Sequence, residues 1–202
     1  MLDRPQTPPP VDGVLAALRE WGANCGPTAI AAALEVPLAT VRGAVSNGDT
    51  FKGYMGVPDF KAAIPRAGGR IVRSWSKPLE PVDAFYADLL LANAAAETNG
   101  EPLVVLIRFC GPWDAIPRAA ATYRHAFAYR RCFVEPRTCW AQASHGPGWV
   151  CDINNLATTD CAPWVPAYVW RTQSLLDLLP KRGDGNVAID WMAQVERIEA
   201  PA

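Results

Sequence analysis

The residue best placed to do chemistry is a cysteine at the start of a predicted helix. Cys25 lies in the run WGANCGP, residues 21–27, and the following residues 28–34 favour a helix. A thiol at a helix N-terminus faces N–H groups and the positive end of the helix dipole, which stabilise the thiolate. Pro27 supports this placement, because proline is favoured in the first helical turn. The sequence therefore predicts a nucleophile at Cys25; the alternative is a buried structural cysteine.

A base for this thiol must come from one of only two histidines. His125 opens an apolar and aromatic run, 125–134, with strand character, whereas His145 is followed by Gly-Pro-Gly and is typical of a turn. A strand holds a side chain in one orientation better than a turn does. We therefore predict His125 as the base and keep His145 as the alternative. A core histidine with both nitrogens satisfied is the other interpretation of His125.

A third group that orients the imidazole is expected in the run WVCDINN, residues 149–155, which has the character of a short strand. Side chains alternate along a strand, so Asp152 and Asn154 would share one face. A carboxylate stabilises an imidazolium more strongly than an amide does. Asp152 is therefore predicted to orient His125, with Asn154 in support. The alternative is an Asp and Asn pair that only closes a turn.

The order Cys25, His125, Asp152, with Asn-Cys-Gly-Pro opening a helix, resembles the papain-like cysteine peptidases of clan CA. The pattern is closest to the branch that processes bacteriocins at double-glycine leaders, and the order matches over residues 20–180. The resemblance implies an α+β fold in which an N-terminal helical part carrying the nucleophile packs on an antiparallel sheet carrying the histidine and the aspartate. Those families commonly have a glutamine as oxyanion donor about six residues before the cysteine. Here that position is Arg19, so Asn24 and the backbone N–H of Cys25 are the predicted donors.

These residues predict acyl transfer without a cofactor. The expected enzyme is a papain-like cysteine peptidase, a hydrolase that cleaves peptide bonds, Gly-Gly or isopeptide bonds among them, through a thioester acyl-enzyme. Its expected partner is a protein or peptide substrate; the substrate's identity and the oligomeric state are left open. Two alternatives belong to other classes: a catalytically silent papain-like binding module, and a viral or polyprotein autoprotease that cuts its own C-terminus.

Length and composition restrict the possible partners. The chain has 202 residues, half of them apolar, and a formal net charge of −1. Without a basic stripe to neutralise phosphates, nucleic acid is not an expected partner. The sequence shows no apolar run of membrane-spanning length, and its first residues lack the apolar region of a signal peptide. We therefore expect no membrane span and an intracellular location in which thiols are reduced.

The other cysteines raise the question of a metal. Four of the six, Cys132, Cys139, Cys151 and Cys161, lie near His145 in one stretch of the chain. Their spacing lacks the paired CxxC pattern of a zinc site, so we predict no metal and reduced thiols. A zinc-stabilised insertion, or disulfides in an exported protein, are the alternatives.

The elements that position these residues can be predicted from periodicity and from turn residues. Residues 1–10 contain four prolines and are expected to form an extended arm. Residues 11–202 are expected to form a single papain-like catalytic domain, with a helical lobe over about 11–68 and a sheet lobe over about 69–202. Asp12 is expected to cap a helix over 14–21. Helices over 81–97 and 172–179 and strands over 70–75, 103–109, 125–134 and 149–153 are expected from these patterns. The resemblance to the papain-like peptidases implies two further helices, over 36–45 and 56–64.

Overall fold

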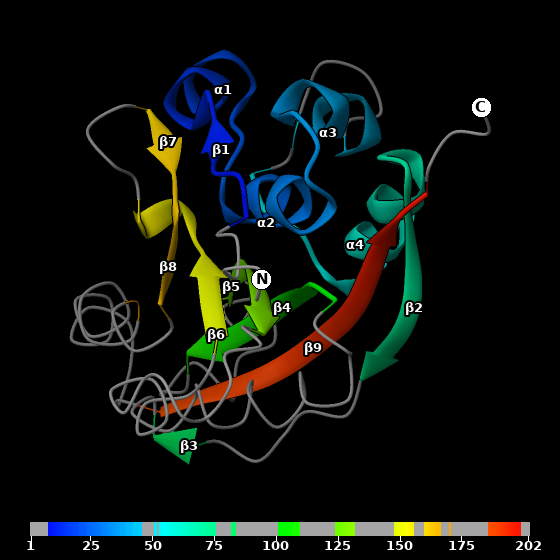
Figure 1. Cartoon of the computed structure of the whole chain (residues 1–202), viewed down its shortest axis with the longest axis vertical. Helices are drawn as coiled ribbons and strands as arrows, with labels where there is room; N and C mark the ends of the chain where they lie inside the picture. The colour runs from blue at the N-terminus through cyan, green and yellow to red at the C-terminus, as the bar shows by residue number, and fades with distance from the viewer. Residues whose placement is uncertain are drawn as a thin grey trace, which may run out of the picture.

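After the two-residue strand β1, helices come first in the chain and the other strands follow, as the computed structural model shows (Figure 1). It describes residues 8–45, 51, 53–75, 82–83, 101–109, 124–131, 148–155, 160–166, 170 and 186–198. The helices are α1 (Val14–Trp21), α2 (Cys25–Leu34), α3 (Leu38–Val45) and α4 (Val57–Arg66). The strands are β1 (Val11–Asp12), β2 (Gly69–Trp75), β3 (Val82–Asp83), β4 (Leu103–Phe109), β5 (Arg124–Arg131), β6 (Gly148–Cys151), β7 (Cys161–Ala162), β8 (Trp164–Pro166) and β9 (Asn186–Arg197).

The main sheet is antiparallel, and its described strands lie in the order β2-β9-β4-β5-β6-β8, with β3 also paired to β9. A separate two-stranded pairing joins β1 to β7. Helices segregated from an antiparallel sheet make this an α+β fold, which confirms the predicted class at that level. Among the described residues, no helix has both the length and the apolar character needed to cross a membrane.

Helix α2 lies at the centre of the fold, with α1 and α3 on one side and the sheet on the other, while α4 packs against β2 (Figure 1). All of its residues after Cys25 are buried, as expected of a helix that is apolar on every side. It packs mainly against β5, where Ala126 and Ala128 face the same core. Small side chains on both elements let the helix approach the strand closely, so the position of β5 directly determines where α2 lies.

Several predicted elements are confirmed with small shifts in their ends. The helix over 14–21 is α1, and the strands over 70–75 and 103–109 are β2 and β4. The helices expected over 36–45 and 56–64 are α3 and α4. The strand predicted over 125–134 is β5 (Arg124–Arg131), and residues 132–134 lie outside the described part. The helix expected over 172–179 lies outside the described residues.

Two expected elements differ from the structure. The helix predicted from residue 81 is wrong at its start, because Val82 and Asp83 form β3 and pair with β9; residues 84–97 lie outside the described part. No strand is predicted from the sequence over the residues of β9. It lies between β2 and β4. Its residues do alternate: Ile189, Trp191, Ala193 and Val195 are buried, whereas Asp190, Gln194 and Glu196 are partly exposed. The sequence therefore holds a strand signal here that the predicted elements miss.

The predicted N-terminal cap of α1 is also wrong. Asp12 does not cap the helix, because it belongs to β1 and pairs with Cys161. The N-cap residue is Gly13, and the carboxylate that accepts the first helical N–H groups is that of Asp160. Its two oxygens accept from the backbone N–H groups of Leu15 and Ala16, the latter at 3.4 Å. A residue from the sheet half of the chain therefore supplies the negative charge that stabilises this helix start.

The described end of the proline-rich arm is packed against the body of the protein. Pro8 is buried, and the carbonyl oxygen of Pro9 accepts a hydrogen bond from the indole N–H of Trp164 at 3.1 Å. Residues 1–7 of the predicted arm lie outside the described part.

Candidate active site

Cys25 is the first residue of α2, and the residue before it fixes the start of the helix. Asn24 is the N-cap: its backbone is extended and its side-chain oxygen accepts from the N–H of Gly26 at 3.2 Å. The carbonyl oxygen of Asn24 accepts from both the N–H and the hydroxyl of Thr28, at 3.1 and 2.8 Å. Such capping determines where the helix begins, and therefore where the Cys25 thiol lies.

The surroundings of Cys25 differ from those of the rest of α2. Its side chain is partly buried, whereas the residues after it are buried. Met55 packs over the next residue so closely that a Cβ atom on Gly26 would lie 2.7 Å from the Met55 sulfur. Only glycine allows this approach. Cys25 therefore lies at the rim of the core, at the helix end where N–H groups stabilise a thiolate.

Asn24, the predicted oxyanion donor, already uses part of its amide group. Its Nδ2 donates to the carbonyl oxygen of Gly53, while its oxygen caps the helix. An amide nitrogen carries two hydrogens, so a role at an oxyanion would use the second one. The bond to Gly53 also connects the helix start to the loop that carries Met55.

The strand that carries His125 lies directly under α2. Position 125 pairs with Ile107 of β4, and α2 packs on β5. The side chain of His125 lies outside the described part of the chain. The alternative base, His145, lies wholly outside it.

Asp152 lies at the end of β6 and not within a strand that continues to residue 155. The expectation that Asp152 and Asn154 share a strand face is wrong, because β6 ends at Cys151 and Ile153–Asn155 form a short 3-10 helix, η4. The carboxylate starts this turn: its Oδ1 accepts from the N–H of Asn154 at 2.8 Å. Asn154 itself is exposed. The turn-closing role that the sequence left as an alternative is therefore present.

The second carboxylate oxygen of Asp152 has a partner of a different kind. Asp152 is 1 % exposed, and its Oδ2 accepts from the indole N–H of Trp170 at 2.7 Å. A buried carboxylate is costly unless hydrogen bonds compensate it, and turn closure alone needs only one oxygen. Sequence reasoning did not single out Trp170, because nothing local in the sequence indicates a contact between residues so far apart.

The three elements that carry the predicted site residues meet around α2. The β5–β6 register places Ala128 opposite Cys151, so Asp152 leaves β6 one step further along β5, toward His125. Helix α2 contacts both β5 and η4, the turn that follows Asp152. Cys25 begins the helix that bridges these two segments. Helix α2, which begins at Cys25, therefore contacts the strand that carries position 125 and the turn that follows Asp152.

Two other described cysteines have raised pKa values. Burial and, secondarily, the charge of Asp152 raise the pKa of Cys151 far above its usual range, and its Sγ donates to the carbonyl of Ala162 at 3.2 Å. Burial, followed by the charge of Asp12 and a hydrogen bond to it, raises the pKa of Cys161. Both thiols are therefore kept protonated and are poor nucleophiles.

The described residues contain no group of three or more His, Cys, Asp or Glu side chains able to hold a metal ion. Cys132, Cys139 and His145, which the zinc alternative needs, lie outside the described part.

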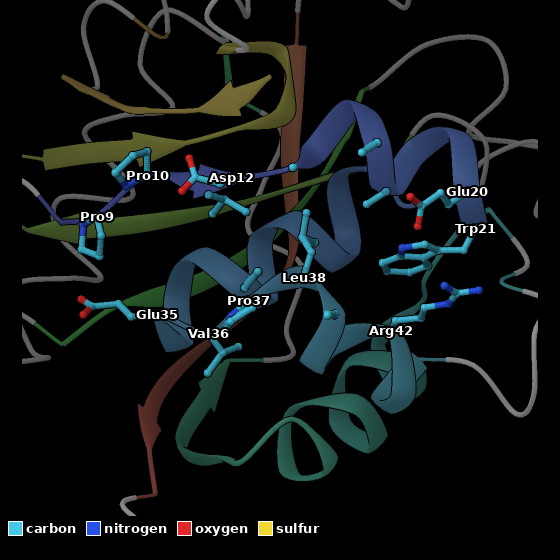
Figure 2. Close-up of a pocket in the computed structure, with 16 residues that line it drawn as sticks. Pro9, Pro10, Asp12, Glu20, Trp21, Glu35, Val36, Pro37, Leu38 and Arg42 are labelled. Atoms are coloured by element: carbon cyan, nitrogen blue, oxygen red, sulfur yellow. The ribbon is translucent and has the colours of Figure 1, made fainter. Parts of the chain in front are cut away.

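A groove of about 520 Å³ lies on another side of α2 (Figure 2). The described end of the arm, α1 and α3 line it, together with Ala31 and Glu35 near the C-terminal end of α2. At ~1.5 Å of rise per residue, Glu35 lies about 15 Å along the helix axis from Cys25. Cys25 is not among the residues that line the groove.

Comparison of the chain with protein-family models, with curated proteins and with solved structures gives no match in any of the three.

Proposed function

We propose that this protein is a papain-like cysteine peptidase that acts through Cys25, His125 and Asp152. The observation that carries the proposal is the placement of Cys25 at the capped start of α2, on a helix that packs on the histidine strand and contacts the turn after Asp152. This chemistry uses a nucleophile and a base, and the third group orients the base. The proposal extends to a protein or peptide as substrate and to an intracellular location.

The proposed reaction follows from these roles. His125 takes the proton of Cys25, and the thiolate attacks the carbonyl carbon of the scissile bond. The backbone N–H of Cys25 and the remaining amide hydrogen of Asn24 bind the oxyanion. When the tetrahedral intermediate collapses, His125 donates the proton to the leaving amine and a thioester remains on Cys25. Water, deprotonated by His125, then attacks the thioester and releases the acid and the thiol.

The role of Asp152 is to orient the imidazole and to stabilise its protonated form. A carboxylate beside an imidazolium favours the thiolate–imidazolium pair over the neutral pair. The two N–H groups that bind Asp152 fix the position of this charge.

Labelling of the thiols tests the proposal most directly. Iodoacetamide is applied over a range of pH, and mass mapping reports the rate at each cysteine. Cys25 is expected to react well below the pKa of about 8.5 of an ordinary thiol, and His125→Ala is expected to abolish this early reaction. Cys161 serves as the internal control, because its raised pKa predicts slow reaction in the same sample. Reaction of Cys25 only at the pH of an ordinary thiol would contradict the proposal.

Turnover separates the proposed peptidase from its two alternatives. A panel of peptide esters and amides, Gly-Gly substrates among them, is tested against the chain and against Cys25→Ala. An active thiol without turnover of any substrate favours the silent binding module. Cleavage only of a C-terminal extension fused to the chain favours the autoprotease.

A further inference from the structure

A buried tryptophan binds the carboxylate of the proposed site. Trp170 is 1 % exposed, and its indole N–H donates to Oδ2 of Asp152 at 2.7 Å. The bond joins residues 18 positions apart in the chain. An indole N–H can only donate, so it binds a carboxylate oxygen and excludes water from it.

The ring of Trp170 is held on the strand that carries His125. It packs against Phe127 of β5, with ring centroids 4.6 Å apart and planes tilted by 45°. Phe127 is two residues after His125 on the same strand. The β5–β6 register places Asp152 level with Phe127 at the point where β6 ends. Trp170 therefore connects the histidine strand to the carboxylate independently of the turn at η4.

We infer that Trp170 is a positioning residue for the peptidase site: its indole N–H fixes the Asp152 carboxylate in the orientation that supports the protonated His125. The inference rests on the proposed function. Oδ1 is bound to a backbone N–H of the turn, which leaves the carboxylate able to rotate about its Cβ–Cγ bond if Oδ2 has no donor. The bond from Trp170 to Oδ2 prevents this rotation.

A second buried tryptophan provides a matched control. Trp191 is 0 % exposed and stacks on Phe60 at 5.6 Å. Its indole N–H has no hydrogen-bond partner among the described residues. Exchange of either tryptophan for phenylalanine removes a similar ring volume from the core, but only Trp170→Phe removes a hydrogen bond to Asp152. A difference between the two variants therefore reports that bond.

The experiment measures the pH at which Cys25 alkylation reaches half of its maximum rate. Trp170→Phe is expected to raise this midpoint, because a misoriented Asp152 supports the imidazolium less and the thiolate is then less favoured. Below the midpoint, the Cys25 rate is expected to fall about tenfold or more, as for loss of a hydrogen bond to a charged group. Trp191→Phe is expected to leave the midpoint unchanged. Replacement of Trp170 by β-(3-benzothienyl)alanine, which keeps the ring shape without the N–H, is expected to act like Trp170→Phe even if the phenylalanine variant folds poorly.

A double-mutant cycle separates a role through Asp152 from a general effect on folding. In the Asp152→Ala background, Trp170→Phe is expected to cause no further shift of the midpoint. An equal shift in both backgrounds, or no shift with either Trp170 replacement while Asp152→Ala does shift the midpoint, would overturn the inference and leave the proposed function standing. A wild-type Cys25 that reacts like an ordinary thiol, whatever occupies position 152, would instead contradict the proposed function.

Discussion

At the scale of single residues, the structure separates three thiols by their environments. Cys25 lies partly buried at a capped helix start, Cys151 is buried beside a carboxylate, and Cys161 lies between two acidic residues. Helix N–H groups favour a thiolate, whereas burial and nearby negative charge oppose it. Among the three cysteines that the structure describes, one is thus a candidate nucleophile and two have surroundings that suppress reactivity.

The catalytic rates of Asp152 variants are expected to depend on whether the substituted side chain keeps the negative charge and the hydrogen bonds. Asp152→Ala is expected to lower kcat/KM by a factor equivalent to about 2–4 kcal/mol, because both the orientation of the base and its charge partner are lost. Asp152→Asn keeps hydrogen bonds and loses the charge, so its rate should lie between those of Asp152→Ala and wild type. Asn154→Ala is the control, since the bond from residue 154 to Asp152 uses the backbone N–H. Kinetics on one acyl substrate decide the ranking, and equal rates for Asp152→Ala and wild type would remove Asp152 from the site.

The buried Cys151 predicts a loss of stability at alkaline pH. Burial raises its pKa in the folded protein far above that of an ordinary thiol, so the folded state keeps the proton that the unfolded state loses. This contribution is fully present below the ordinary thiol pKa of about 8.5, and the free energy of unfolding falls as pH rises above that value. Urea unfolding between about pH 7 and pH 10.5 should show a smaller alkaline loss for Cys151→Ala than for wild type, relative to each protein's own stability at neutral pH. An equal fall of the free energy of unfolding with pH in both proteins would show that Cys151 does not cause the alkaline loss of stability.

At the scale of elements, α1 depends on a carboxylate from the other half of the chain. Asp160 lies just before β7, with a positive φ of 54°. Its side chain caps α1, and its carbonyl oxygen accepts from the N–H of Gly13 at 3.0 Å. The β1–β7 pairing continues this contact. One residue thus joins the first helix to the sheet half of the fold.

Removal of this cap should destabilise the protein. Asp160→Ala is expected to lower the free energy of unfolding by about 1–2 kcal/mol, because two N–H groups of α1 lose their acceptor. Asp160→Asn should cost less, since it retains an acceptor and tolerates the left-handed backbone. Asp12→Ala is the matched control at the exposed position that the sequence indicated as the cap. Chemical denaturation of the three variants provides the comparison, and a larger effect for Asp12→Ala would contradict the capping role of Asp160.

The sequence predicted elements well where local signals determined them. Strand β4 is a continuous apolar run, and the helix after Cys25 is marked by Asn24 and Pro27, so both could be read locally. The predicted strand through Asn154 failed because the Asp152 carboxylate starts a turn. The contacts made by Asp160 and Trp170 could not be predicted, since each depends on residues brought together only by the folded chain.

At the scale of the whole molecule, β9 joins β2 to the other strands of the main sheet. It pairs with β2 on one side and β4 on the other, as the long strand in Figure 1 shows. Ala193 of this strand is buried in the core that the helices cover, and the next residue, Gln194, is partly exposed. The packing of helices on the sheet therefore depends on the last described strand of the chain.

A negative charge introduced into β9 should lower the free energy of unfolding by different amounts on its two faces. Ala193→Asp is expected to lower the free energy of unfolding by about 3 kcal/mol or more, because it buries an uncompensated carboxylate in the core. Gln194→Asp introduces the same side chain one position later and should cost much less. Thermal unfolding and gel filtration distinguish the two variants, and similar losses would contradict the assigned faces of β9.

The pairing of β1 with β7 has a consequence for how the chain acquires its structure during synthesis. Residues 11–12 leave the ribosome well before their partners at 161–162 and the cap of α1 are made. The central position between β2 and β4 is also filled only when β9 has emerged. Contacts of such long sequence separation slow folding and delay it until most of the chain exists. A nascent chain that holds α1 and α2 but lacks β9 therefore exposes the apolar surfaces that a chaperone binds.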